Sequence, residues 1–128
     1  MTGHRPLTID PPPGRTILVA VVGTVAEADL AIAAGADMID GSGLSDQAMA
    51  ALRTRHPGLR LWAGSPHAVD AGQAPESPAA VVATAAVLTW LGSPAIRTRH
   101  VLPVRRAIDM TSSIAGTRLP SLTTRGLG

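Results

Sequence analysis

The feature that most constrains this chain is a regular alternation between short apolar segments and longer segments that carry helix caps. Residues 16–22 read TILVAVV, a continuous β-branched run typical of a strand buried on both faces of a parallel sheet. Thr24 and Glu27 follow with the spacing of a capping box, which predicts a helix start, and Gly35 predicts its end. The same alternation continues to Gly116, so we expect a chain of βα units.

Four strands and four helices are expected from this pattern. The expected strands are Thr16–Val22, Ala36–Asp40, Leu59–Ala63 and Ala95–Thr98. The expected helices are Val25–Ala34, a second one opened by Ser45 or Leu44 and ended by His56-Pro57-Gly58, Pro78–Leu91, and a fourth from Leu102-Pro103 to Gly116. Gly64–Glu76 is expected to be a loop. The third helix is apolar nearly all round, which predicts burial on more than one side.

Alternating strands and helices predict an α/β fold with a parallel sheet and right-handed crossovers. A complete TIM barrel needs about 200 residues or more, whereas this chain has 128. We therefore expect a partial barrel, about half of one, as a half-barrel that dimerises, an open sheet or the remnant of a larger fold. A single domain is expected over residues 16–116, between a proline-rich arm at 1–15 and a tail at 117–128.

The composition excludes several classes of function. Cysteine is absent, which excludes disulfides and cysteine nucleophiles, and the four histidines show no paired spacing for a metal. Two tryptophans are the only aromatic side chains of the Phe, Trp and Tyr class, too few to stack on nucleic-acid bases. No apolar run reaches the roughly 18 to 20 residues of a membrane span, and Asp10 with several prolines replaces a signal peptide's apolar region. We expect a cytoplasmic protein with no metal, no cofactor, and no nucleic-acid or membrane partner.

The positive charge is concentrated at the C-terminal end. Residues 1–96 hold five arginines against eight acidic residues, a net charge of −3, whereas residues 97–128 hold six arginines against Asp109 alone, a net charge of +5. All eleven cations are arginine, so chemistry that needs a lysine amine is excluded. The arginines at this end form either a solvated basic face or part of an anion site.

Residues 92–116, GSPAIRTRHVLPVRRAIDMTSSIAG, resemble the last strand and helix of the dihydropteroate synthase family, whose members typically read I-R-V-H-D-V there. Residues 77–92, SPAAVVATAAVLTWLG, are similar to the alanine-rich helix before that strand. Residues 31–43, AIAAGADMIDGSG, resemble the family's second strand. Together these segments cover about half of the chain. The resemblance implies a TIM-barrel fold, a pterin pyrophosphate ligand and transferase activity in folate biosynthesis.

The chain also departs from the family pattern. The family's loop N-V-T-P-D-S-F-S-D-G after the first strand is missing, because Val22-Gly23 leads directly to the helix cap at Thr24. The pterin-binding aspartates of the middle strands have no counterpart. Where the family has S-R-K, the chain keeps Ser65 and places His67 at the position of the lysine. The resemblance therefore implies a pterin- or phosphate-binding protein without complete synthase activity alone.

Five residues are candidates for binding phosphate or substrate. Arg97 matches the family arginine that holds pyrophosphate, and a guanidinium at the C-terminal end of a parallel strand can bind phosphate with two hydrogen bonds. Arg99 lies two residues further on, so we expect it to point the same way and to share the anion. Asp40 at the end of the second expected strand, with Ser65 and His67 after the third, completes the set.

Three functions remain open. The first is pterin or phosphate binding by a degenerate synthase-like protein, with any catalysis needing a partner chain. The second is a non-catalytic subunit that pairs with itself or with a full-length homologue through open sheet edges and apolar helix faces. The third is a small half-barrel enzyme on a phosphorylated metabolite, with Asp40 and His67 as acid and base. In each case Arg105 and Arg106 on the last helix are expected to be solvated.

Overall fold

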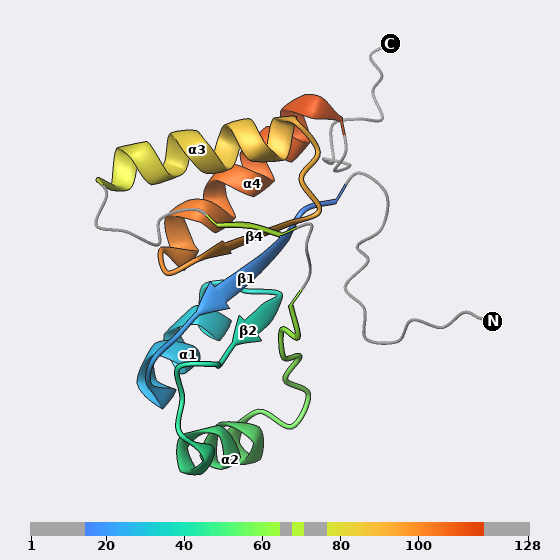
Figure 1. Ribbon diagram of the computed structural model, residues 1–128. Coiled ribbons are helices and arrows are strands. Elements are labelled where there is room, and N and C mark those ends of the chain that lie inside the picture. Colours follow the sequence, from blue (N-terminus) through green and yellow to red (C-terminus); the bar gives the residue numbers. More distant parts are fainter. Residues whose placement is uncertain (1–14, 65–67, 71–76, 117–128) are drawn as a thin grey trace, which may run out of the picture.

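The computed structural model of this chain describes residues 15–64, 68–70 and 77–116. Strands and helices alternate throughout this part, as expected. The elements are β1 (Ile17–Val21), α1 (Val25–Ala33), β2 (Met38–Asp40), α2 (Asp46–Arg55), β3 (Ala68–Asp70), α3 (Pro78–Trp90), β4 (Ala95–Thr98) and α4 (Val101–Ala115) (Figure 1). The expected arm, apart from Arg15, and the expected tail lie outside the described residues.

The four strands form one parallel sheet in the order β2-β1-β4-β3. Val19 of β1 is paired with Met38 of β2 on one side and with Arg97 of β4 on the other. The steps from β1 to β2 and from β3 to β4 run in the same direction across the sheet. Right-handed crossovers therefore place α1 and α3 on the same face.

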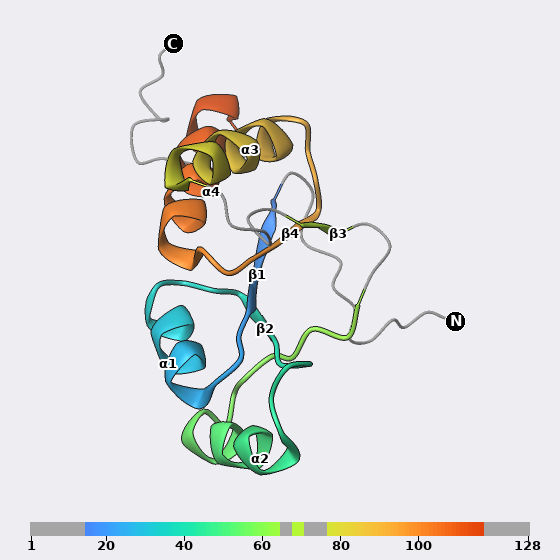
Figure 2. The same ribbon diagram turned by 60° about the vertical axis from the view of Figure 1, so that its left-hand side comes forward.

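The two faces of the sheet are covered differently. Leu18, Ala20, Ile39 and Ile96 project from one face and pack with buried residues of all four helices. Ile17, Val19, Met38 and Ala95 project from the opposite face, which we call the second face, and Trp62 packs against them. Among the described residues, this second cluster takes no member from a helix. In Figure 2, α1, α3 and α4 accordingly lie on one side of the strands. The expected fold class, alternating βα units with a parallel sheet, is therefore confirmed. A sheet with its helices on a single face is compatible with both the expected partial barrel and the expected open sheet.

The third strand differs from the expectation. The expected strand Leu59–Ala63 forms a single bridge, between Leu61 and Ile39 of β2, with hydrogen bonds from Ile39 N to Arg60 O and from Trp62 N to Ile39 O. The actual β3 lies inside the expected loop Gly64–Glu76, at the far edge of the sheet. Three residues are too few for periodicity to reveal a strand, and β3 is defined by its pairing with β4, which is distant in sequence.

The helix ends follow the sequence signals closely. Glu27 N donates to the Thr24 hydroxyl at 3.0 Å, as expected for the capping box, whereas the Glu27 carboxylate reaches back one residue further than expected and accepts from Gly23 N at 2.7 Å. Ser45 and Ser77 cap α2 and α3 in the same way, each accepting from the amide three residues on. No helix in the described part of the chain is long and apolar enough to cross a membrane.

The expectation that α3 is buried on more than one side is wrong. Its buried residues Val81, Ala85 and Thr89 lie on one face, whereas Val87 and Trp90 are 57% and 60% exposed. The apolar composition of this helix therefore does not reflect its burial. Helix α3 follows β3 at the edge of the sheet, and within the described residues only α4 packs closely beside it.

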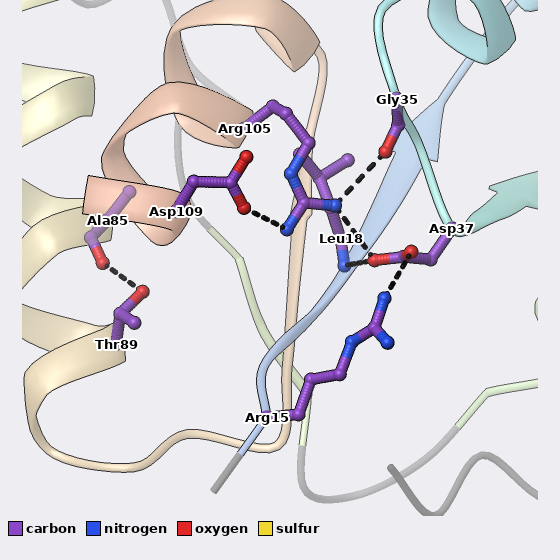
Figure 3. A network of polar contacts seen from close by, with 8 residues as sticks. All are labelled: Arg15, Leu18, Gly35, Asp37, Ala85, Thr89, Arg105 and Asp109. Carbon is purple, nitrogen blue, oxygen red and sulfur yellow. Dashed lines mark hydrogen bonds and ion pairs between the residues drawn. The ribbon is translucent and has the colours of Figure 1, made fainter. Parts of the chain in front are cut away.

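A network of hydrogen bonds and ion pairs around Asp37 and Arg105 lies at the amino-terminal end of the sheet (Figure 3). The Asp37 carboxylate accepts from Leu18 N at 2.9 Å, from Arg105 Nη1 at 3.0 Å and from Arg15 Nη2 at 3.3 Å. Arg105 Nη1 also donates to Gly35 O at 3.0 Å, and its Nη2 lies 3.1 Å from the Asp109 carboxylate.

The expectation of a solvated Arg105 is wrong, since its side chain is only 15% exposed, whereas Arg106 is exposed as expected. Gly35 has a φ of 101°, and a Cβ there would lie 2.9 Å from the Arg105 side chain.

We expect Arg105→Ala to lower the free energy of unfolding by about 2 to 3 kcal/mol, because it leaves the partly buried Asp37 carboxylate with fewer donors. Urea denaturation measures this change. Arg106→Ala, one residue away on the exposed side of α4, is the matched control and is expected to change it by less than about 0.5 kcal/mol. Equal losses in the two variants would contradict the structural role of the network.

Candidate functional site

One cation lies between two carboxylates at the carboxyl-terminal end of the sheet. Nη2 of Arg97 lies 3.4 Å from Oδ2 of Asp40, and its Nε lies 3.2 Å from Oδ1 of Asp70. These three residues, which we call the Arg97 cluster, come from β4, β2 and β3. Ligands of parallel α/β sheets bind at this end of the strands, so the cluster is the candidate functional site.

The strand pattern explains why these side chains meet. Arg97 follows Ala95 by two residues in β4, so both project from the second face. Asp40 likewise follows Met38 in β2. Asp70 is paired directly with Arg97 across the β3–β4 ladder, which places the two side chains next to each other.

The two carboxylates of the cluster have different environments. The Asp40 side chain is 6% exposed, and its Oδ1 accepts a hydrogen bond from Ser42 N at 3.0 Å. The Asp70 side chain is 55% exposed, and within the described residues its partner is Arg97. Asp40 is therefore fixed by burial and by the backbone, whereas Asp70 is held by an ion pair that water can replace.

The side chain of Arg97 makes ion pairs but no hydrogen bond to a described residue. Its buried Nε has no hydrogen-bond partner among these residues, because Asp70 Oδ1 is within contact distance but poorly aligned. The Nε of Arg105 also lacks a partner, yet Nη1 of that residue donates two hydrogen bonds. Arg97 thus keeps donor capacity that the described part of the protein does not use.

Arg99 lies apart from this cluster, on the helix-covered side. It lines a cavity of about 430 Å³ between α1 and the start of α4, together with Glu27, Leu30 and Leu102 among others. Strand β4 ends at Thr98, whose hydroxyl accepts from His100 N at 2.9 Å and turns the chain. The alternation stops there, so Arg99 does not point the same way as Arg97.

Two of the expected site residues, Ser65 and His67, lie outside the described residues. Of the five candidates, the structure therefore brings together Arg97 and Asp40 and places Arg99 elsewhere. In the described part of the chain, no group of three or more histidine, aspartate or glutamate side chains is arranged to hold a metal ion.

Sequence reasoning missed Asp70. The residue stands in a stretch rich in alanine, glycine and proline, where no periodicity marks a strand. Its importance follows from the pairing of β3 with β4. The only local signal is that Asp70, like Asp40, is an acidic residue at the end of a short apolar segment.

A second polar cluster lies on the helix side, between α1 and the end of α2. The His56 ring contacts the Asp29 carboxylate at 2.7 Å, and Arg55 Nη2 donates to the same carboxylate at 2.6 Å. The hydrogen bond from His56, supported by Arg55, lowers the pKa of Asp29 below its ordinary value. This cluster joins the two helices and explains His56 without a metal or catalytic role.

Comparisons of the chain with protein-family models, with curated proteins and with solved structures found no match.

The environments of the two carboxylates predict different effects on stability. Asp40→Ala is expected to lower the free energy of unfolding by about 1 to 3 kcal/mol, because it removes the acceptor for Ser42 N and leaves Arg97 half-buried with a single carboxylate. Asp70→Ala is expected to cost about 0.5 kcal/mol or less, since its ion pair is exposed. Urea denaturation of both variants tests the difference. A larger loss for Asp70→Ala would show that β3 depends on this carboxylate.

Proposed function

We propose that this chain binds the phosphate of a phosphorylated small molecule at the Arg97 cluster, and that a pterin pyrophosphate is such a ligand. The observation that carries the proposal is a partly buried arginine at the carboxyl end of a parallel sheet, whose Nε donor has no hydrogen-bond partner among the described residues. A phosphate oxygen is a strong acceptor for such a group, and the planar guanidinium can bind two oxygens at once.

Asp40 supports this role in two ways. Its buried carboxylate lies 3.4 Å from Arg97 Nη2 and therefore restrains the guanidinium at the strand ends. A buried carboxylate also accepts hydrogen bonds from N–H groups of a ligand. A molecule that carries both a phosphate and a nitrogen-rich ring has groups for each partner.

The choice of a pterin rests on the resemblance of residues 31–43 and 77–116 to dihydropteroate synthases. Arg97 stands at the position of the family arginine that holds pyrophosphate, and it is the residue at the centre of the cluster. The family's first-strand loop and its middle-strand aspartates are missing from the sequence. We therefore propose ligand binding without complete synthase activity by this chain alone.

Calorimetric titration with pyrophosphate, and with a pterin pyrophosphate, tests the proposal at fixed ionic strength. Arg97→Lys keeps the charge but loses the fork of N–H donors, so we expect about a tenfold loss of affinity. Arg106→Lys on the exposed side of α4 is the matched control and is expected to bind as the wild type does. Arg99→Lys is also expected to have little effect, because Arg99 lies in a different cavity.

Equal losses for these three variants would mean that the arginines attract anions through a general positive surface, whose effect falls steeply with salt. Absence of binding to both ligands in the wild-type protein would contradict the proposed function.

A second candidate function is assembly with another copy of this chain or with a homologue. Residues of α3 and α4 on the outer surface are exposed and apolar, and the whole of α3 carries no charged residue. Those with the highest exposure are Val87, Trp90, Leu91, Met110 and Ile114. Exposed apolar groups gathered on neighbouring helices are typical of protein–protein contact surfaces.

If this surface mediates assembly, Leu91→Glu is expected to shift the protein toward the monomer, because the added carboxylate would lose its water in the contact. Sedimentation velocity over a range of concentrations measures the shift. Gln47→Glu adds the same charge on α2 and is expected to leave the distribution unchanged. A wild-type protein that remains monomeric at the highest concentration would rule out self-assembly.

A further inference from the structure

The Arg97 cluster contains one cation and two carboxylates, so two anionic groups share one guanidinium. Asp40 and Asp70 approach different nitrogens of Arg97, at 3.4 Å and 3.2 Å. Neither contact is a well-aligned hydrogen bond, and Nε has no hydrogen-bond partner within the part of the chain that the structure describes. An anion able to bind Nε with good geometry would therefore gain more than either carboxylate does here.

The two carboxylates differ in what their release from Arg97 would cost. Asp40 is 6% exposed, and separation from Arg97 would leave a buried charge with the Ser42 amide as its hydrogen-bond donor. That loss is large for a buried carboxylate. Asp70 is 55% exposed and sits on a three-residue strand at the edge of the sheet. Water can solvate it at little cost.

We infer that Asp70 occupies the ligand's anion position on Arg97 and is displaced when a phosphate binds. This inference rests on the proposed function and adds a regulatory residue to the same site. Asp40 stays bound and holds the guanidinium, while the carboxylate of Asp70 is exchanged for a ligand oxygen. The exchange also favours dianionic and more highly charged phosphates over monoanions such as carboxylates. A ligand carboxylate would gain nothing by replacing the carboxylate of Asp70, whereas a phosphate is a stronger hydrogen-bond acceptor than either.

The inference predicts an unusual direction of change, namely that removal of a charge at the site tightens binding. Asp70→Asn keeps the size of the side chain but weakens its hold on Arg97 and its repulsion of the ligand. We expect pyrophosphate to bind about three- to tenfold more tightly to this variant than to the wild type. Isothermal titration calorimetry with sodium pyrophosphate at fixed ionic strength measures both affinities on the full chain.

Two further variants separate displacement from a general charge effect. Asp46→Asn removes the same charge from the exposed start of α2 and is expected to leave the affinity unchanged. In the Arg97→Lys background, Asp70→Asn is expected to give less than half of its gain, because the gain acts through the guanidinium. An equal gain in Asp46→Asn, or an undiminished gain without Arg97, would overturn the inference.

The outcomes also distinguish this inference from the proposed function. If wild type and Asp70→Asn bind pyrophosphate equally, the function stands and the displacement is wrong. If only Asp70→Asn binds, Asp70 blocks the site instead of being displaced, so the inference is wrong and the wild-type chain lacks the proposed function. If neither protein binds at millimolar pyrophosphate while urea denaturation shows both to be folded, the proposed anion site itself is wrong and the inference falls with it.

Discussion

The carboxylate of Asp37 joins parts of the chain that are far apart in sequence. It accepts from the backbone of β1 at Leu18, from Arg105 of α4 and from Arg15 ahead of β1. Because Asp37 directly precedes β2, these contacts link the amino-terminal ends of β2 and β1 to helix α4. The register of the sheet then determines which side chains meet at its carboxyl-terminal end, where the Arg97 cluster lies.

The two ends of the sheet use the same residue types for different purposes. At the amino-terminal end Arg105 donates to Gly35 O and Asp37 and is mostly buried, so its donors are largely satisfied by the protein. At the carboxyl-terminal end the side chain of Arg97 has two carboxylates within ion-pair distance but no hydrogen bond to a described residue. The first arrangement stabilises the fold. The second leaves donors without a partner among the described residues, at the end of the sheet where parallel α/β proteins generally bind their ligands.

Local sequence signals predicted the elements that depend on local physics. The observed β4 has the expected bounds Ala95–Thr98, and the four helices begin and end within a residue or two of their predicted caps, because caps and glycine stops act over one helical turn.

The candidate site depends on strand pairing and on contacts between residues distant in sequence, which local signals do not reveal. Arg97 and Asp40 were predicted from their positions at strand ends, whereas Asp70 depends on the pairing of β3 with β4. Arg99 was expected beside Arg97, but the Thr98 hydroxyl turns the chain after β4. Arg105 was expected in solvent, but it is held by Asp37 and Gly35, which are distant in sequence, and by Asp109 on its own helix.

The charge of the Arg97 cluster differs in sign from the charge of the C-terminal part of the sequence that contains Arg97. Residues 97–128 carry a net charge of +5, but the cluster itself combines one guanidinium with two carboxylates. A general excess of arginine would attract any anion, and salt would screen that attraction over a distance of about 10 Å at 0.1 M. A guanidinium that is already paired attracts few anions in this way. If a phosphate binds at Arg97 as we propose, its affinity depends on the geometry of the new hydrogen bonds and on the release of an existing partner. Selectivity would then arise from exchange rather than from net charge.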